Sequence, residues 1–182
     1  NIPIKDFKLK SLRDNIALVQ QEVFLFSDSI LNNITLYDDS ISRAEVVNAS
    51  KEIGIYEFII SLPGGLDYVV GERGVTLSSG QRQLIAFLRV LVNNPDILIL
   101  DEATSSIDSY SEDLIKNATK KITKDKTSII IAHRLSTIES ADKIIYMENG
   151  KILESGNHKE LLNISNGKFK KLYEEQFVDE LV

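Results

Sequence analysis

The chain contains no cysteine among its 182 residues. Disulfide bonds and thiolate metal sites are therefore excluded, and the composition agrees with a cytosolic protein. The sequence also has no apolar run near the roughly 18 residues that a transmembrane helix needs, and no signal peptide is visible. Any role at a membrane is therefore expected to depend on a partner or on a segment outside these residues.

Positive charge is also scarce. The 21 lysines and arginines are outnumbered by 27 aspartates and glutamates, which gives a net charge of -6 and a pI near 5.0. This balance argues against nucleic acid as a main partner. It leaves phosphate binding open, because backbone N–H groups and helix N-termini bind phosphate locally. The hydrophobic content of 43% supports a core, and the length fits one domain or slightly more.

Three apolar runs have the length and composition of strands that are buried on both faces of a parallel sheet. These runs are Ile16–Val19, Ile97–Leu100 and Ser128–Ile131, with helical patterns between them that suit parallel crossovers. Polar groups that can meet a phosphate, a metal ion or water follow the three runs: Gln21, Asp101 with Glu102, and His133. If the strands are parallel, these groups share the edge of the sheet where ligands bind in such folds.

Helices are predicted from two starting points with clear signals. Ser42 and Glu45 have the spacing of a capping box before a helix that runs to about Gly54, and a wide apolar stripe follows Ser79. An Asn149-Gly150 pair between apolar runs predicts a β-hairpin. Further helices are predicted at about 109–122 and from Lys168, with short ones ending near Ile34 and Leu62.

The adjacent carboxylates of Asp101 and Glu102 are the first candidates for chemistry. Charge at the end of a buried strand is costly unless it binds a metal or a partner. One interpretation makes Asp101 a Mg²⁺ partner through water and Glu102 the base that polarises an attacking water, as in a nucleoside triphosphatase. The alternative is an acidic N-cap of a helix that follows the strand.

The segment Leu77–Gln81 is the second candidate. Gly80 permits close backbone approach at the start of a helix, where free N–H groups can bind a phosphate. Ser78 and Gln81 add side-chain hydrogen-bonding groups. The alternative is a helix that is simply capped by a serine.

The remaining candidates are weaker when each is taken alone. A single histidine such as His133 is more often structural, and a glutamine such as Gln21 is common on surfaces. Their predicted position at the shared sheet edge supports a functional role for both. The residues Phe24–Phe26 directly after Gln21 either belong to the core or form an exposed apolar patch for a partner.

In this order the segments resemble the nucleotide-binding domain of ATP-binding cassette (ABC) transporters, in particular that of exporters. The resemblance runs from about residue 4 to about residue 178. Ser79 departs from it, because the family usually has glycine there. The matching segments are Gln21 (Q-loop), Gly71–Gly74 (exporter loop), Leu77–Gln81 (signature), Ile97–Glu102 (Walker B), Ser105–Asp108 (D-loop) and Ala132–Leu135 (H-loop).

The resemblance implies an α/β fold like that of P-loop nucleoside triphosphatases, with a parallel sheet core. Residues of about 28–92 are implied to form an inserted helical subdomain that carries the signature, and residues 1–27 and 93–182 to form parts of the RecA-like core and the C-terminal helices. The implied ligands are ATP and Mg²⁺. The implied partners are a second nucleotide-binding domain in a head-to-tail dimer and the transmembrane domain of a transporter, at the cytoplasmic face of the cell membrane.

The resemblance also implies roles for single residues. Asp101 and Gln21 are expected at the metal ion, and Glu102, His133 and Gln21 are expected to be catalytic. The signature residues are expected to touch the γ-phosphate of ATP held by the partner domain. The ATP-binding residues implied in this way are Ser78, Ser79, Gly80, Gln81 and Asp108.

One family motif does not occur in the sequence. The pattern G-x-x-x-x-G-K-[ST], which cradles phosphates, is absent from the 182 residues, and the chain begins with Asn1 rather than methionine. We therefore expect the C-terminal part of a longer domain, inactive in isolation. Two alternatives are a soluble ABC-type ATPase that acts on DNA or ribosomes, and a non-enzymatic module that contributes only its signature loop to a partner.

Overall fold

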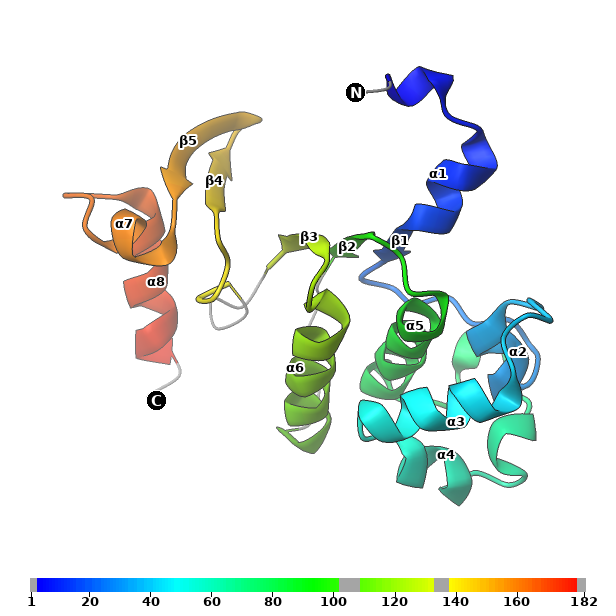
Figure 1. Ribbon diagram of the computed structural model, residues 1–182. Coiled ribbons are helices and arrows are strands. Elements are labelled where there is room, and N and C mark those ends of the chain that lie inside the picture. Colours follow the sequence, from blue (N-terminus) through cyan, green and yellow to red (C-terminus); the bar gives the residue numbers. More distant parts are fainter. Residues whose placement is uncertain (1–2, 102–108, 133–137, 180–182) are drawn as a thin grey trace. The chain divides into compact units, whose positions relative to one another are not determined.

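The computed structural model describes residues 3–101, 109–132 and 138–179 (Figure 1). The chain divides into two compact units, Asn1–Ile131 and Ala132–Val182. The first unit contains a parallel sheet with helices, and the second contains a β-hairpin with two helices. The chain therefore has the mixed α/β fold that the sequence predicts.

The sheet of the first unit is parallel and has the strand order β1-β2-β3. Its strands are β1 (Ile16–Val19), β2 (Ile97–Asp101) and β3 (Thr127–Ile131). Val19 pairs with Leu100 and Asp101 pairs with Ile131, so the three carboxyl ends lie at one edge. This arrangement confirms the predicted parallel strands.

Only one face of this sheet is well covered by the described residues. Leu98 and Leu100 are at most 4% exposed, whereas Leu18 and Ile129 are 55% and 56% exposed. The prediction that these strands are buried on both faces is therefore wrong for this structure. The reason is that successive side chains point to opposite faces, and helices α5 (Ser79–Asn93) and α6 (Ser109–Thr123) lie on the same face (Figure 1).

Short helices fill most of the segment between β1 and α5. Helix α3 (Arg43–Glu52) begins at the predicted capping box: the Glu45 backbone N–H donates to Ser42 Oγ at 3.2 Å, and the Ser42 N–H donates to Glu45 Oε2 at 2.7 Å. This box satisfies N–H groups that a helix start leaves without partners. The other elements before α5 are η1 (Ile4–Asp6), α1 (Leu9–Asn15), α2 (Ile30–Thr35), α4 (Tyr56–Ser61), η2 (Gly65–Asp67) and η3 (Glu72–Gly74).

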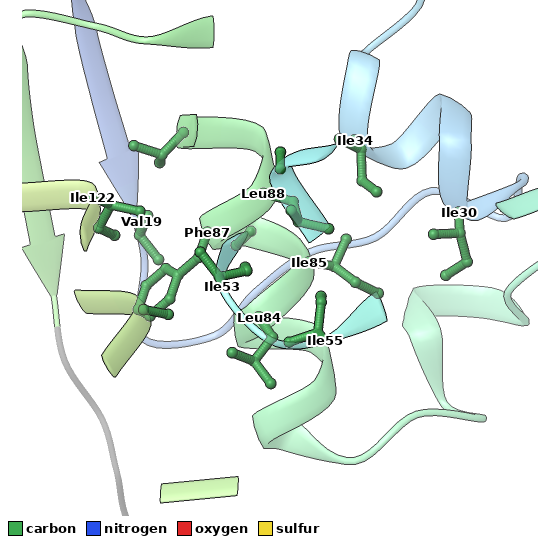
Figure 2. Packing of buried hydrophobic residues seen from close by; sticks show 14 of the residues in the cluster. Val19, Ile30, Ile34, Ile53, Ile55, Leu84, Ile85, Phe87, Leu88 and Ile122 are labelled. Carbon is green, nitrogen blue, oxygen red and sulfur yellow. The ribbon is translucent and has the colours of Figure 1, made fainter. Parts of the chain in front are cut away.

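Helix α5 lies at the centre of the hydrophobic core of this unit. Figure 2 shows Ile85 on the side of Ile30 and Ile34 from α2, and Phe87 on the side of Val19 and Ile122. All these side chains are at most 4% exposed. Burial of each large side chain contributes roughly 1.5–3 kcal/mol. Helix α5 therefore joins the sheet and the short helices into one packed unit.

The second unit is built on the antiparallel hairpin of β4 (Ile144–Glu148) and β5 (Lys151–Gly156), followed by α7 (His158–Leu162) and α8 (Lys168–Asp179). Asn149 and Gly150 both have positive φ, as the predicted hairpin turn requires. The Glu154 carboxylate accepts the N–H groups of Lys168 and Phe169 at 2.6 and 3.1 Å and so caps α8. Within the parts of the chain that are described, no helix is both long and apolar enough to cross a membrane.

Candidate functional site

The carboxyl edge of the parallel sheet carries the first group of predicted site residues. Asp101 is the last residue of β2 and is half-buried, and Gln21 is exposed just after the end of β1. The structure therefore brings Asp101 and Gln21 to the same edge. The predicted site residues Glu102, Asp108 and His133 lie outside the described residues.

The donor chemistry at this edge fits a magnesium ion. Among the described residues, no three histidine, aspartate or glutamate side chains are grouped so that they could hold a metal ion. Magnesium does not need such a group, because it keeps several water ligands and is usually held by one or two carboxylates together with phosphate oxygens. The carboxylate of Asp101 and the amide oxygen of Gln21 are oxygen donors of the kind that this ion prefers.

The N-terminus of α5 carries the second group of predicted site residues. The Gln81 backbone N–H donates to Ser78 Oγ at 3.2 Å, and the Ser78 N–H donates to Gln81 Oε1 at 2.9 Å. Ser78 and Gln81 thus form a capping box, which contains the serine cap that was the alternative for this segment. Among the described residues, no backbone carbonyl accepts the N–H of Ser79 or Gly80. This pair of N–H groups, which a helix start leaves without helical partners, can meet an anion.

The loop before this helix is fastened to α5 and to the segment after β1. The Arg82 guanidinium donates to the Leu77 carbonyl at 2.6 Å and reaches the Gly74 carbonyl at 3.5 Å. Gly74 has φ +72°, and a Cβ there would lie 3.0 Å from both Arg82 Cδ and Leu25 Cδ1. The exporter-loop match at Gly71–Gly74 is therefore in close contact with the base of α5.

The segment Phe24–Phe26 combines the two alternatives that the sequence left open. Leu25 is fully buried in the core, whereas Phe24 and Phe26 are 52% and 46% exposed. The two phenyl rings meet edge to face, with centroids 5.2 Å apart. An exposed pair of aromatic rings held in fixed geometry is a feature of interaction surfaces.

A partly buried polar contact between α5 and this segment was not predicted from the sequence. Arg89 Nε donates to the Asn33 carbonyl at 2.5 Å, Nη1 donates to the Phe24 carbonyl at 3.0 Å, and Nη2 donates to Asn33 Oδ1 at 3.2 Å. Burial lowers the pKa of Arg89 to about 10, so its guanidinium stays charged at neutral pH. The signal in the sequence was an arginine within the apolar stripe of a helix expected to be buried.

A carboxylate near the start of α2 lies in a hydrogen-bonded cluster. The Tyr37 hydroxyl donates to Asp28, whose carboxylate also accepts the Ser29 backbone N–H and the Asn32 side-chain amide at 2.6 and 3.0 Å. These donors lower the pKa of Asp28, with Tyr37 as the largest cause, and the same contact raises the pKa of Tyr37. The cluster favours the ionised form of Asp28.

Comparison with known sequences gives a match to one protein family and to membrane export proteins. The sequence model of the family described as "ABC transporter" matches residues 1–105. The chain is 50% identical over 177 residues to an ATP-dependent lipid A-core flippase of Haemophilus influenzae (strain 86-028NP), covering 97% of this chain and 30% of that protein. It is 51% identical over 170 residues to a putative multidrug export ATP-binding/permease protein of Staphylococcus aureus (strain NCTC 8325 / PS 47), covering 93% of this chain and 29% of that protein.

Comparison with solved structures gives a match to the same family. The structure of a bacterial Atm1-family ABC exporter with ATP bound superposes with a TM-score of 0.84 at 41% sequence identity. The match covers 95% of this chain and 30% of that chain. The chain thus spans about 30% of the length of the relatives that it matches.

Proposed function

This chain belongs to the ABC transporter family, and from that premise we propose that it is the C-terminal part of an ATP-binding domain that drives export across a membrane. One observation carries the proposal. The parallel register of β1, β2 and β3 brings Asp101 and the segments that lead to Gln21 and His133 to a single edge. Polar groups at such an edge are suited to bind a nucleotide. The similarity to exporters supports this direction of transport.

We assign roles at the strand edge from the chemistry of the side chains. Asp101, with Gln21, would hold Mg²⁺, whose charge neutralises phosphate oxygens when it is bound. Glu102 would polarise the attacking water as a general base, and His133 would donate a hydrogen bond to the terminal phosphate. In this proposal the acid–base chemistry depends on Glu102.

The signature segment would serve a second copy of the domain. In a head-to-tail dimer, the signature residues would face the γ-phosphate of ATP held by the partner domain; they are Ser78, Ser79, Gly80 and Gln81. Asp108, in the D-loop that follows the Walker B segment, would also contribute to ATP binding. The N–H groups of Ser79 and Gly80 support this assignment, because the start of α5 favours negative charge. ATP binding would then favour the closed dimer over the open one.

The proposed partner on the other side is the transmembrane domain of the transporter. The Phe24–Phe26 segment and the Glu72–Gly74 segment both contact helix α5, because Arg89 donates to the Phe24 carbonyl and Arg82 reaches the Gly74 carbonyl. The Phe24 and Phe26 rings are exposed and can meet a partner. We propose that residues 28–92 act as the helical, signature-bearing subdomain and residues 1–27 and 93–182 as parts of the core. The domain would work at the cytoplasmic face of the membrane.

The proposal is tested by two serine substitutions that remove the same structural contact. Ser78 and Ser42 each form a capping box at the start of a helix, but only Ser78 lies in the proposed ATP site. In this chain, Ser78→Ala and Ser42→Ala should each lower the free energy of unfolding by about 1 kcal/mol, measured by urea titration. In the longer protein, Ser78→Ala should lower kcat/KM for ATP by about tenfold, because it removes a hydrogen bond to phosphate.

Ser42→Ala is the control and should leave ATP hydrolysis of the longer protein unchanged. If both variants changed kcat/KM equally, the effect would belong to stability and the assignment of the signature segment would be wrong. If neither variant changed it, Ser78 would have only its capping role. A wild-type protein that binds ATP but never hydrolyses it would instead favour the non-enzymatic module.

A further inference from the structure

Two arginines on α5 hold the two loops that flank this helix. Arg82 and Arg89 are about two helical turns apart and so lie on the same side of α5. Both guanidinium groups donate to backbone carbonyls: Arg82 to the loop that contains Gly74 and Leu77, and Arg89 to Phe24 and Asn33. Backbone carbonyls have fixed positions along a loop, so each arginine fixes the path of the chain.

Asn33 connects Arg89 to the backbone of Phe26 in the aromatic pair. The Asn33 side chain is fully buried; its Oδ1 accepts the Phe26 N–H at 2.8 Å and Arg89 Nη2 at 3.2 Å. Its Nδ2 donates to the carbonyls of Phe26 and Ser29 at 2.9 and 3.0 Å. The amide group of Asn33 therefore has its oxygen and its nitrogen occupied, and it holds the backbone of Phe26 at both the N–H and the carbonyl.

The contact resists substitution by other polar groups because it is directional and because Asn33, its acceptor, is fully buried. The guanidinium is planar and offers donors in a fixed fork, whereas a lysine ammonium is a single point charge on a flexible stem. Breaking one of these bonds leaves a buried donor or acceptor without a partner, which is costly. Arg89 keeps its charge at neutral pH although burial lowers its pKa to about 10, and this charge strengthens its bonds to the carbonyls.

We propose that Asn33 and Arg89 are positioning residues that fix the Phe24–Phe26 aromatic pair to helix α5. The aromatic pair and the Ser78–Gln81 segment at the start of α5 then move as one body. The consequence for transport rests on the proposed function, in which the aromatic pair meets the transmembrane domain and the segment meets ATP. The mechanical link itself is a property of this chain and can be measured without nucleotide.

The absence of cysteine allows a direct distance measurement. Spin labels would be attached at Ser27→Cys, next to the aromatic pair, and at Ser79→Cys, at the start of α5; both serines are exposed. Double electron–electron resonance on this double variant should give one narrow distance distribution. Arg89→Lys in the same background should broaden it about twofold, because the lysine cannot reproduce the fork.

A matched control separates this effect from the loss of any arginine. Arg43→Lys makes the same substitution at an exposed arginine of α3 that pairs with Asp67 at 2.7 Å, and it should leave the distribution narrow. A distribution that stays narrow in Arg89→Lys, or that broadens equally in Arg43→Lys, would overturn the proposal. So would a broad distribution in the parent.

A second variant serves if Arg89→Lys does not fold, as judged by circular dichroism. Asn33→Asp keeps an oxygen acceptor for Arg89 and for the Phe26 N–H but loses the donations from Nδ2 to the carbonyls of Phe26, Asp28 and Ser29. It should also broaden the distribution, and an unchanged width would contradict the role of Asn33.

In the longer protein in lipid vesicles, Arg89→Lys should keep KM for ATP within about twofold and lower kcat about tenfold, because binding is retained and coupled closure is lost.

The ATPase measurement and the spin-label distance measurement can contradict their respective proposals separately. A wild-type protein without ATP hydrolysis would refute the proposed function and leave the distance measurement valid. An Arg89→Lys variant with raised KM and unchanged kcat would contradict a positioning role, because it would indicate a contribution to nucleotide binding alone.

Discussion

Gly74 has a left-handed backbone conformation, φ +72°, in a place with little room for a methyl group. A Cβ there would lie 3.0 Å from both Arg82 Cδ and Leu25 Cδ1. Gly64 has a similar conformation, φ +88°, but its nearest neighbours would be 3.9 Å from a Cβ. Both glycines belong to the first unit. The two positions thus share backbone strain and differ in packing.

Gly74→Ala should therefore destabilise the chain more than Gly64→Ala. Backbone strain alone should cost about 1–2 kcal/mol at either position. At Gly74, the forced movement of Leu25 and Arg82 should add about 1 kcal/mol. Urea titration followed by circular dichroism measures both values, and equal losses of free energy would show that the contacts of Gly74 adjust without cost.

Single residues were predictable where their signal is local. The capping box of Ser42 and Glu45 was predicted from a spacing of three, and the structure confirms it. The box at Ser78 and Gln81 has the same spacing and was considered only as a serine cap. Asn33 and Arg89 were missed because their contact joins distant parts of the chain. The arginine in an apolar stripe signals a buried polar contact but does not identify its partner.

At the scale of elements, the strands and most helices were predictable, and their surroundings were not. Strand β1 has the predicted bounds, and the hairpin turn at Asn149-Gly150 is confirmed. An apolar run shows that a strand is suited to burial, but it does not show how many faces are covered. Helices α1 and α7 were not predicted, because each is short and has little apolar periodicity.

The segment around α2 should become less stable in acid. The pKa of Asp28 is lowered in the folded chain, mainly by the Tyr37 hydroxyl. A carboxylate with a lowered folded pKa stabilises the fold above its unfolded pKa, about 4, and loses this contribution as the pH falls through the folded value. The pKa of Asp67 is lowered in the same direction by Arg43. The free energy of unfolding should therefore fall below about pH 4.

Asp28→Asn tests this dependence. The variant should lose stability at pH 6 and show a smaller further loss between pH 5 and pH 3 than the parent, as measured by urea titration at each pH. Tyr37→Phe keeps the carboxylate and removes the main cause of the shift, so it should also reduce the dependence. A pH dependence that is unchanged in both variants would show that Asp28 does not contribute to it.

At the scale of the whole molecule, the sheet of the first unit presents an apolar row to its open face. Leu18 pairs with Ile99, and Ile99 pairs with Ile129, so the three side chains lie side by side on one face. Leu18 and Ile129 are more than half exposed. Apolar rows of this kind favour association. We therefore predict that this chain self-associates as its concentration rises.

Ile129→Lys should shift the chain toward monomer, because it places a charge within the exposed apolar row. Ile60→Lys is the matched control: Ile60 is 50% exposed on helix α4, outside the sheet. Light scattering over a range of concentrations measures both variants. A parent chain that is monomeric at every concentration and melts cooperatively would contradict the prediction.

The family was predictable for the whole molecule because its signal does not depend on packing. Several short motifs in one order identify an ABC transporter domain, and the comparisons confirm this family. The roles of the predicted site residues all remain predictions, and Glu102, Asp108 and His133 also lie outside the described residues. A motif specifies which residues are present, whereas the position of a side chain at a strand edge also depends on the segments packed around it.

The most direct test is the hydrolysis of ATP by the longer protein that carries this chain, compared with its Glu102→Gln variant. Glutamine keeps the size of the side chain and removes the base. We predict that the wild type hydrolyses Mg-ATP and that the variant still binds it but turns over at least about a hundredfold more slowly. A Glu102→Gln variant as active as the wild type would contradict the account.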